Sequence, residues 1–273
     1  MQFQEVLQAI FLGIVEGLTE FLPVSSTGHL IVAGWAIGFE GAGADTFFVA
    51  IQAGAILAVC WYYRERIFSI LLNLFKPGKD RRLAINTVVA FFPAAVLGLF
   101  LAKAIKAYLF NPVTVAVTLI AGGIVILLVE RANIKSSREP RVKEMDDMTA
   151  KDAFGVGCMQ CLALIPGMSR SGATIIGGMV LGLSRKAATE FSFFLSIPTI
   201  FGATVYDLYK SYDTLSVDMG PAILVGGVVS FISAIIVVKW LLAFVSHNDF
   251  RGFGWYRIAF GLVVLLLVGE LTF

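Results

Sequence analysis

Apolar residues run along most of this chain in blocks about as long as a membrane-spanning helix. A stretch of roughly 20 apolar residues is long enough to cross the hydrocarbon core of a bilayer as a helix. Segments of this kind lie at about 45–63, 84–102, 112–130, 187–209, 221–244 and 254–271. The pattern therefore predicts an all-α polytopic membrane protein with six transmembrane helices.

Two further apolar stretches, 5–38 and 152–182, differ from these six. Each consists of two short hydrophobic pieces separated by a turn rich in Pro, Ser and Gly. Non-helical backbone is tolerated at membrane depth only where it is buried in protein or lines a water-filled cavity. Both stretches are therefore predicted to be re-entrant helical hairpins, which enter the membrane and return to the same side.

The basic residues predict how the chain is oriented. The loops 64–82 and 131–151 each carry six Lys or Arg residues, and two predicted crossings separate them. They therefore share a side, which the positive-inside rule assigns to the cytoplasm. Arg185 falls on that side only if 152–182 is re-entrant, and Arg257 is placed at the edge of a further cytoplasmic loop. Both chain ends are then expected on the outer face.

The second hairpin resembles the first when the sequence is shifted by 144 residues. The shift places Ser25-Ser26-Thr27-Gly28 over Ser169-Arg170-Ser171-Gly172. The halves, about 1–131 and 145–273 of a single domain spanning 1–273, each hold one hairpin and three crossings. Because an odd number of crossings leaves the chain on the opposite side of the membrane, we expect the second half to be inverted relative to the first. Inverted repeats with broken helices place their binding site near the middle of the bilayer, where the halves meet.

Composition narrows the class of protein. The chain is 58% hydrophobic and 15% charged, which excludes an ordinary soluble domain. Three cysteines give no disulfide framework, and Cys158 and Cys161 are interpreted as packing residues in an apolar helix. Residues 1–60 contain no Lys or Arg, so we expect no cleavable signal peptide. No nucleic-acid partner is expected.

Polar side chains gather at the two hairpin turns. Glu16 and Glu20 are four residues apart, so both carboxylates lie on one face of a helix. The other candidates are Ser25, Ser26, Thr27 and His29 at the first turn and Ser169, Arg170, Ser171 and Thr174 at the second. A helix begins after each turn, and helix N-termini favour anions. Arg170, interpreted as the only basic residue at membrane depth, adds a fork suited to two phosphate oxygens.

Three interpretations of these residues remain open. The carboxylates of Glu16 and Glu20 suit a divalent cation, Mg²⁺ or Ca²⁺, since such ions are commonly bound through one or two carboxylates. The same carboxylates could instead form a buried salt bridge with Arg170. The overall plan is also typical of a secondary transporter or flippase of an anionic lipid or solute.

Two motifs carry a resemblance to a known family. The run Glu16-Gly-Leu-Thr-Glu-Phe-Leu-Pro-Val-Ser-Ser-Thr-Gly-His29 and the run Pro166-Gly-Met-Ser-Arg-Ser-Gly-Ala-Thr174 resemble the bacterial undecaprenyl-pyrophosphate phosphatases linked to bacitracin resistance. The resemblance extends from Leu7 through the last span. It implies an inner-membrane enzyme that removes the terminal phosphate of the C55 lipid carrier for cell-wall synthesis, with an active site open to the periplasmic face.

The resemblance also implies roles for the candidate residues. The positions that match the catalytic set of the family are Glu16, Glu20, Ser26, His29 and Arg170, with Ser25, Thr27, Ser169, Ser171 and Thr174 nearby. We expect Ser26 to attack the terminal phosphorus, with His29 or Glu20 as the base that takes its proton. In a rival scheme His29 is the nucleophile, and the sequence does not decide between them. It also leaves open whether the protein forms a homo-oligomer.

Overall fold

A computed structural model of the chain describes residues 3–40, 43–136, 139–210 and 219–270, apart from the side chains of residues 102, 106, 208 and 210. The described part is all-helical, with no β-strand. Its helices are α1 (Phe3–Thr19), α2 (Ser26–Ala36), α3 (Ala44–Tyr62), α4 (Arg64–Asn73), α5 (Lys79–Tyr108), α6 (Pro112–Ser136), the 3₁₀ helix η1 (Met145–Asp147), α7 (Ala150–Gln160), the 3₁₀ helix η2 (Cys161–Leu164), α8 (Arg170–Val180), α9 (Arg185–Lys210), α10 (Gly220–Val245) and α11 (Arg251–Leu266).

Five of these helices, α3, α5, α6, α9 and α10, are long and apolar enough to cross a membrane. The prediction of an all-helical, multi-pass membrane protein is thereby confirmed. The sixth predicted span, 254–271, corresponds to α11, which has 16 residues, and residue 271 lies outside the described part. At 1.5 Å per residue α11 is about 24 Å long, short of the roughly 30 Å hydrocarbon core. The count of six crossings therefore stays a prediction.

Both broken apolar stretches fold as helix, turn, helix. The first consists of α1 and the 11-residue α2, and the second of α7, η2 and the 11-residue α8. A helix of 11 residues is only about 17 Å long, too short to span a bilayer. The breaks thus lie where the Pro/Ser/Gly turns predicted them, and re-entry from one side stays a prediction.

Local backbone geometry recurs at the 144-residue offset. Ser25 and Ser169 are the two non-glycine residues of the described chain with positive φ, at 72° and 70°. Gly38 and Gly182, at the ends of the two hairpins, have φ of 68° and 93°. This region of φ is unfavourable for L-residues with a side chain. The coincidence supports a structural repeat, while the inverted orientation of the halves stays a prediction.

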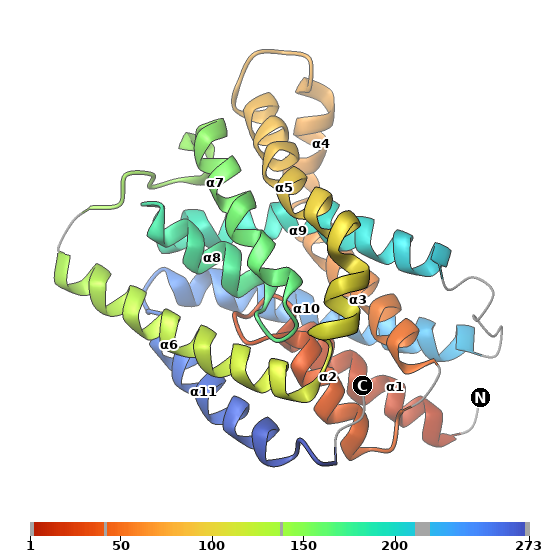
Figure 1. Cartoon of the computed structure of the whole chain (residues 1–273). Helices are drawn as coiled ribbons and strands as arrows, with labels where there is room; N and C mark the ends of the chain where they lie inside the picture. Colours follow the sequence, from red (N-terminus) through yellow and green to blue (C-terminus); the bar gives the residue numbers. More distant parts are fainter. Residues whose placement is uncertain (1–2, 41–42, 137–138, 211–218, 271–273) are drawn as a thin grey trace.

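The hairpins pack closely against long helices of the opposite half. α1 lies on α10 and α7 lies on α5, while α6 and α11 run side by side along one flank (Figure 1). A Cβ atom on Gly13 would lie 2.5 Å from the carbonyl oxygen of Gly226, and one on Gly157 would lie 2.4 Å from that of Ala90. Only glycine permits such approaches. The two hairpins are therefore held in matching ways.

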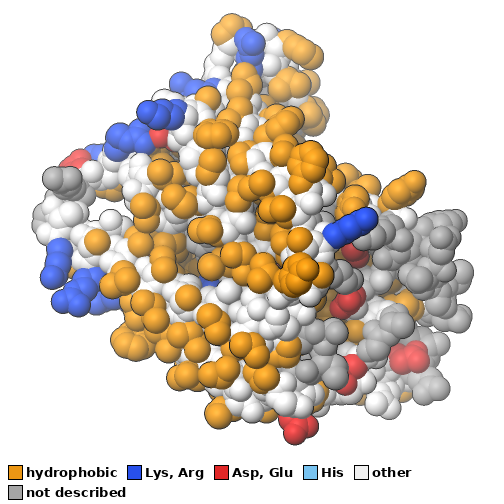
Figure 2. Space-filling view, in the orientation of Figure 1, with side chains coloured by type: hydrophobic (Ala, Val, Ile, Leu, Met, Phe, Trp, Pro, Cys, Tyr) orange, Lys and Arg blue, Asp and Glu red, His pale blue; other side chains and the backbone are white. Residues whose placement is uncertain are grey.

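The surface divides by charge and polarity. In Figure 2 hydrophobic side chains cover the visible face, while Lys and Arg gather along the upper left edge and Asp and Glu lie mostly at the lower right. The predicted loop 64–82 contains the helix α4, which the sequence pattern did not indicate. Arg138, in the second basic loop, lies outside the described residues. The apolar belt and the basic edge fit a protein embedded in a bilayer.

Candidate active site

The first hairpin turn ends in a capped helix N-terminus. α1 stops at Thr19, and the chain turns through Pro23, which has no N–H to continue a helix. Ser25 is the N-cap of α2, and its hydroxyl accepts a hydrogen bond from the backbone N–H of Gly28 at 3.4 Å. α2 begins at Ser26. The Ser26 hydroxyl therefore lies at a helix start, where free N–H groups favour an anion.

The second turn repeats this construction. Ser169 caps α8, and its hydroxyl accepts from the backbone N–H of Gly172 at 3.0 Å. The two turns are in direct contact, since the Ser171 hydroxyl donates to the carbonyl oxygen of Leu22 at 2.7 Å. The structure thus brings the starts of α2 and α8 together, as the sequence predicted.

Glu20 lies at the centre of this junction. Its Oε2 accepts a hydrogen bond of 2.5 Å from the Ser26 hydroxyl, and its Oε1 pairs with Nη2 of Arg170 at 2.9 Å. Glu20 and Ser26 are 8% and 7% exposed. One carboxylate therefore links a buried hydroxyl of the first turn to the guanidinium of the second. It lies where a base that removes the Ser26 proton has to lie.

The Arg170 guanidinium is oriented by several further contacts. Its Nη1 donates to the carbonyl oxygen of Ser192 at 3.1 Å, and its charge lies 5.7 Å from the centroid of the Phe21 ring. Its buried Nε has no hydrogen-bond partner among the described residues. Arg170 is thus fixed in place while it retains a free donor, which suits binding of an anionic oxygen.

The hydroxyls predicted to bind phosphate divide into two groups. Thr174 donates to the main-chain carbonyl oxygen of Arg170 at 2.9 Å and lies 2.7 Å from the hydroxyl of Ser192, the residue whose carbonyl oxygen binds the guanidinium. Ser171 is likewise engaged by the first turn, and Ser169 lies 3.0 Å from Ser171. Thr27 has no hydrogen bond among the described residues and is partly exposed. Of the predicted hydroxyls Thr27 is the freest to meet a ligand.

The ring of His29 contacts Ser25, Tyr256 and Phe260 and forms no hydrogen bond with the Ser26 hydroxyl in the described structure. Its Nδ1 lies 2.7 Å from the carbonyl oxygen of Ser25, and its Nε2 lies 2.6 Å from the hydroxyl of Tyr256. The ring also stacks on Phe260, with centroids 4.1 Å apart. A carbonyl can only accept, so Nδ1 carries a proton, and in the neutral ring Nε2 accepts from Tyr256. The structure therefore brings Glu20, and not His29, to the Ser26 hydroxyl.

Glu16 lies one helical turn before Glu20 and is completely buried. Neither of its carboxylate oxygens has a hydrogen-bond partner among the described residues. A buried carboxylate without a partner is costly, so its retention indicates a ligand or a bound proton. Both oxygens of Glu20 are already engaged, which leaves Glu16 as the better candidate ligand for a divalent cation. The described residues contain no cluster of three or more acidic, His or Cys side chains that could hold a metal ion, so an Mg²⁺ or Ca²⁺ here would depend on one or two carboxylates and on oxygens from outside the protein.

Sequence reasoning was wrong about Arg257, which lies inside the protein and not at a loop edge. It is 1% exposed, and it donates five hydrogen bonds to backbone carbonyl oxygens. The acceptors are Pro23 of the first turn, Gly167 and Met168 of the second, and Thr118 and Leu119 of α6. Arg170 is therefore not the only basic residue at the hairpin turns. Tyr256, the neighbour of Arg257, was also not identified from the sequence.

Comparison with known proteins places this architecture in a family. Residues 9–263 match the family model described as bacitracin resistance protein BacA. The chain is 57% identical to the undecaprenyl-diphosphatase of Herminiimonas arsenicoxydans over 95% of this chain and 94% of that protein. It is 56% identical to the undecaprenyl-diphosphatase of Nitrosomonas europaea and 52% identical to that of Cupriavidus metallidurans, each over 97% of this chain and 96% of the relative. The chain belongs to the bacitracin resistance protein BacA family.

Proposed function

We propose that this protein is a membrane phosphatase that hydrolyses undecaprenyl pyrophosphate to undecaprenyl phosphate and inorganic phosphate. The observation that carries the proposal is the contact of Ser26, Glu20 and Arg170 where two helix N-termini meet. It combines a hydroxyl nucleophile, its base and a phosphate-binding cation in one buried site. The names of relatives more than 50% identical over nearly the whole chain agree with this chemistry. Recycling of the lipid carrier for cell-wall synthesis would account for resistance to bacitracin.

The geometry supports a two-step displacement. The Ser26 hydroxyl attacks the terminal phosphorus while Glu20 takes its proton, and the bond to the oxygen of the lipid monophosphate breaks. Water then attacks the phosphoserine, and inorganic phosphate leaves as the Ser26 oxygen recovers a proton from Glu20. Arg170 and the N–H groups at the starts of α2 and α8 stabilise the charge on the phosphoryl oxygens in both steps.

A divalent cation is part of the proposal. Glu16, with Glu20 beside it, would hold Mg²⁺ or Ca²⁺. When bound, the cation supplies positive charge that neutralises the pyrophosphate. Arg170 pairs with Glu20 and would keep its carboxylate oriented beside Glu16.

The location of the site is also a proposal. Basic residues collect at one edge of the molecule, and the positive-inside rule assigns that edge to the cytoplasm (Figure 2). The described chain ends, at the start of α1 and beyond α11, lie toward the opposite side in Figure 1. The first hairpin begins at that opposite end. We therefore place the protein in the bacterial cytoplasmic membrane, with its site open to the periplasmic face.

The decisive experiment measures phosphate release from undecaprenyl pyrophosphate by the purified chain in detergent. Release that disappears in Ser26→Ala and persists in Ser246→Ala, a serine outside the site, is expected. A secondary transporter of anionic lipid would bind the substrate without releasing phosphate. Absence of release by the wild-type protein would therefore contradict the proposal.

A trapping experiment decides between Ser26 and His29 as the nucleophile. Substrate labelled at the terminal phosphate is quenched during turnover, and the labelled protein is exposed to acid and to base. Acid-stable label that depends on Ser26 is expected, because the Nε2 of His29 is occupied by Tyr256. Acid-labile, base-stable label would assign the role to His29. The same role would pass to His29 if Ser26→Ala retained more turnover than His29→Ala.

A further inference from the structure

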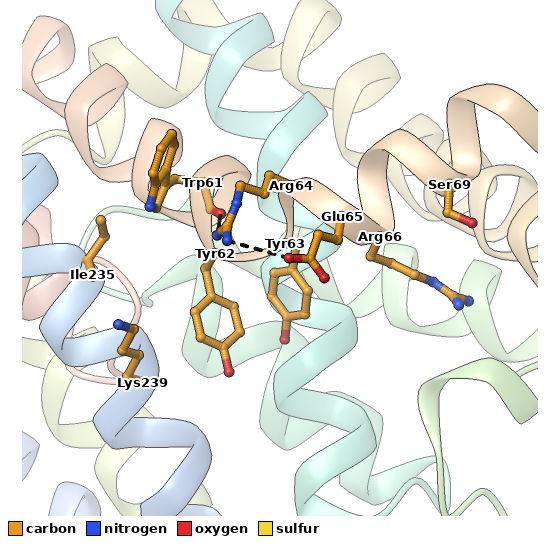
Figure 3. Close-up of a pocket in the computed structure, with 9 residues that line it drawn as sticks. All are labelled: Trp61, Tyr62, Tyr63, Arg64, Glu65, Arg66, Ser69, Ile235 and Lys239. Atoms are coloured by element: carbon orange, nitrogen blue, oxygen red, sulfur yellow. Dashed lines mark hydrogen bonds and ion pairs between the residues drawn. The ribbon is translucent and has the colours of Figure 1, made fainter.

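A cavity of about 600 Å³ lies between the junction of α3 with α4 and the helix α10. Figure 3 shows the Trp61–Arg64 segment on one side of it and Ile235 and Lys239 of α10 on the other. None of the residues that line it belongs to a hairpin. It lies at the ends of α3 and α10 that the charge pattern assigns to the cytoplasm. The cavity is therefore distinct from the proposed active site.

The cavity presents two cations that are available to a ligand. Lys239 is exposed and forms no hydrogen bond or ion pair within the described structure. The Arg64 guanidinium is held in place by a 3.1 Å hydrogen bond to the carbonyl oxygen of Trp61 and lies 5.1 Å from the centroid of the Trp61 ring. Its contact with Glu65 is long, at 3.4 Å, and both side chains are mostly exposed, so this pair is weak.

A third cation of the lining, Arg66, is already neutralised. It pairs with Asp80 at 3.2 Å and with Asp146 at 2.5 Å, which ties α4 to α5 and η1. Arg66 thus contributes to the wall of the cavity, and Arg64 and Lys239 supply its free positive charge. Glu65, 89% exposed, is the one acidic residue in the lining. The lining therefore has a net positive charge, with Lys239 unpaired among the described residues and Arg64 only weakly paired.

The apolar part of the lining indicates which kind of anion fits. Trp61 is 57% exposed at the last turn of the membrane-spanning α3, and Ile235 continues the apolar surface along α10. Tryptophan and tyrosine prefer the level of the lipid headgroups. The Tyr63 ring, which packs on Phe194, adds a second aromatic side chain at this level. Basic pockets between helices on the cytoplasmic side are typical binding sites for anionic headgroups.

We propose that this cavity binds the headgroup of an anionic phospholipid from the leaflet on the basic side of the protein. Arg64 and Lys239 contact the phosphate from opposite sides, and the acyl chains lie along Trp61 and Ile235. The proposal does not depend on the phosphatase activity, because the two sites share no residue.

Native mass spectrometry of the detergent-purified full chain tests the proposal, with phosphatidylglycerol and phosphatidylcholine as the two probes. The wild-type protein should retain phosphatidylglycerol in preference to phosphatidylcholine. A basic residue near an anionic lipid surface contributes a factor of roughly 5 in affinity. Arg64→Gln or Lys239→Gln should therefore weaken phosphatidylglycerol binding about 5-fold, and the double variant about 25-fold.

Two controls separate this site from general charge effects. Arg131→Gln combined with Lys135→Gln removes the same charge from exposed positions on α6 and should leave the binding unchanged. Lys239→Arg keeps the positive charge and should retain phosphatidylglycerol binding. Glycerol 1-phosphate, which has the charge without the acyl chains, should compete weakly. If it displaces the lipid at equal concentration, the cavity is a site for free phosphate esters and the proposal is wrong.

Two further outcomes would contradict the proposal. One is equal retention of phosphatidylglycerol and phosphatidylcholine by the wild-type protein. The other is a loss of phosphatidylglycerol binding in the α6 double variant as large as that in the Arg64→Gln, Lys239→Gln double variant. If Lys239→Arg loses as much binding as Lys239→Gln, the effect comes from packing and not from charge. Phosphate release by each variant shows whether it is folded, since the cavity contains no residue of the proposed active site.

Discussion

Arg257 offers the sharpest test of how the two hairpins are held together. Its guanidinium has five N–H groups, and all are used, at distances of 3.0–3.3 Å, on carbonyl oxygens of both turns and of α6. It forms no ion pair with an acidic side chain among the described residues. Its buried charge is stabilised by backbone dipoles instead. We infer that Arg257 is a positioning residue, which sets the place of Ser26 relative to Arg170.

The substitution Arg257→Lys keeps the positive charge but replaces the planar guanidinium with a compact ammonium. An ammonium has three donors, so at least two of the five hydrogen bonds are lost. A hydrogen bond that involves a charged group contributes about 1.5–3 kcal/mol. Two bonds at the lower end of this range amount to about 3 kcal/mol, which corresponds to on the order of 100-fold in rate if the loss falls on the transition state. We expect kcat to fall by about that factor with a small change in KM, because Arg257 is buried and all its donors are used within the protein, which leaves none for the substrate.

The assay is steady-state phosphate release from undecaprenyl pyrophosphate, together with thermal unfolding in the same detergent. Arg251→Lys is the matched control, since Arg251 begins the same helix, is 56% exposed and pairs with Asp249. Gly122→Ala is an independent perturbation. A Cβ at residue 122 would lie 2.3 Å from Nη2 of Arg257, so this variant should reproduce the loss of kcat without altering the arginine.

Three results would refute this reasoning. A kcat for Arg257→Lys close to that of the wild type would show that the Ser171–Leu22 and Arg170–Glu20 contacts suffice to hold the turns. A raised KM with unchanged kcat would mean that Arg257 contributes to substrate binding and not to positioning. If Arg257→Lys does not fold, an active Gly122→Ala protein would contradict the proposed role on its own.

Other predictions concern the proposed catalytic groups and the orientation in the membrane. Arg170→Lys should lose most phosphate release, because the compact ammonium cannot reproduce the planar, two-pronged contact of the guanidinium with Glu20 and the Ser192 carbonyl oxygen; near-normal turnover would remove the role. Glu16→Gln should raise the Mg²⁺ or Ca²⁺ concentration needed for half-maximal activity, and an unchanged metal dependence would leave Glu16 a structural or acid–base role. In intact cells a membrane-impermeant thiol reagent should label Lys103→Cys and not Lys79→Cys, and the reverse pattern would overturn the orientation.

The hairpins could be predicted because their cause is local. Proline removes a backbone N–H donor, so the break at Pro23 follows from a few adjacent residues. Which of the neighbouring hydroxyl residues caps the next helix does not follow from the sequence, and the structure shows Ser25. The long apolar spans follow from composition in the same way. The charge count also predicted one basic edge, because it depends on many residues and tolerates single errors.

Arg257 could not be predicted because its partners have no sequence pattern. When a guanidinium binds side-chain carboxylates, its partners can be sought among the acidic residues of the sequence. The acceptors of Arg257 are all main-chain carbonyl oxygens, which every residue has. The same residue lies near Arg251 at the start of an apolar run, where charges usually extend toward the lipid headgroups. The Tyr256–His29 contact was missed for a similar reason, since 227 residues separate the two side chains.

The two turns share a backbone and differ in chemistry, and this difference explains why the site needs both. Ser25 and Ser169 adopt the same unusual φ and cap equivalent helices, so the offset of 144 residues aligns the turns position by position. At the four aligned positions where the first turn has Glu16, Glu20, Ser26 and His29, the second has Gln160, Leu164, Arg170 and Ala173. Arg170 thus occupies the place that Ser26 occupies in the other turn. The second turn lacks carboxylate, hydroxyl and imidazole at these positions, and it supplies the cation that the first turn lacks. A repeat with identical turns would bring like charges together, whereas this asymmetry sets a base and a hydroxyl against a guanidinium across the junction.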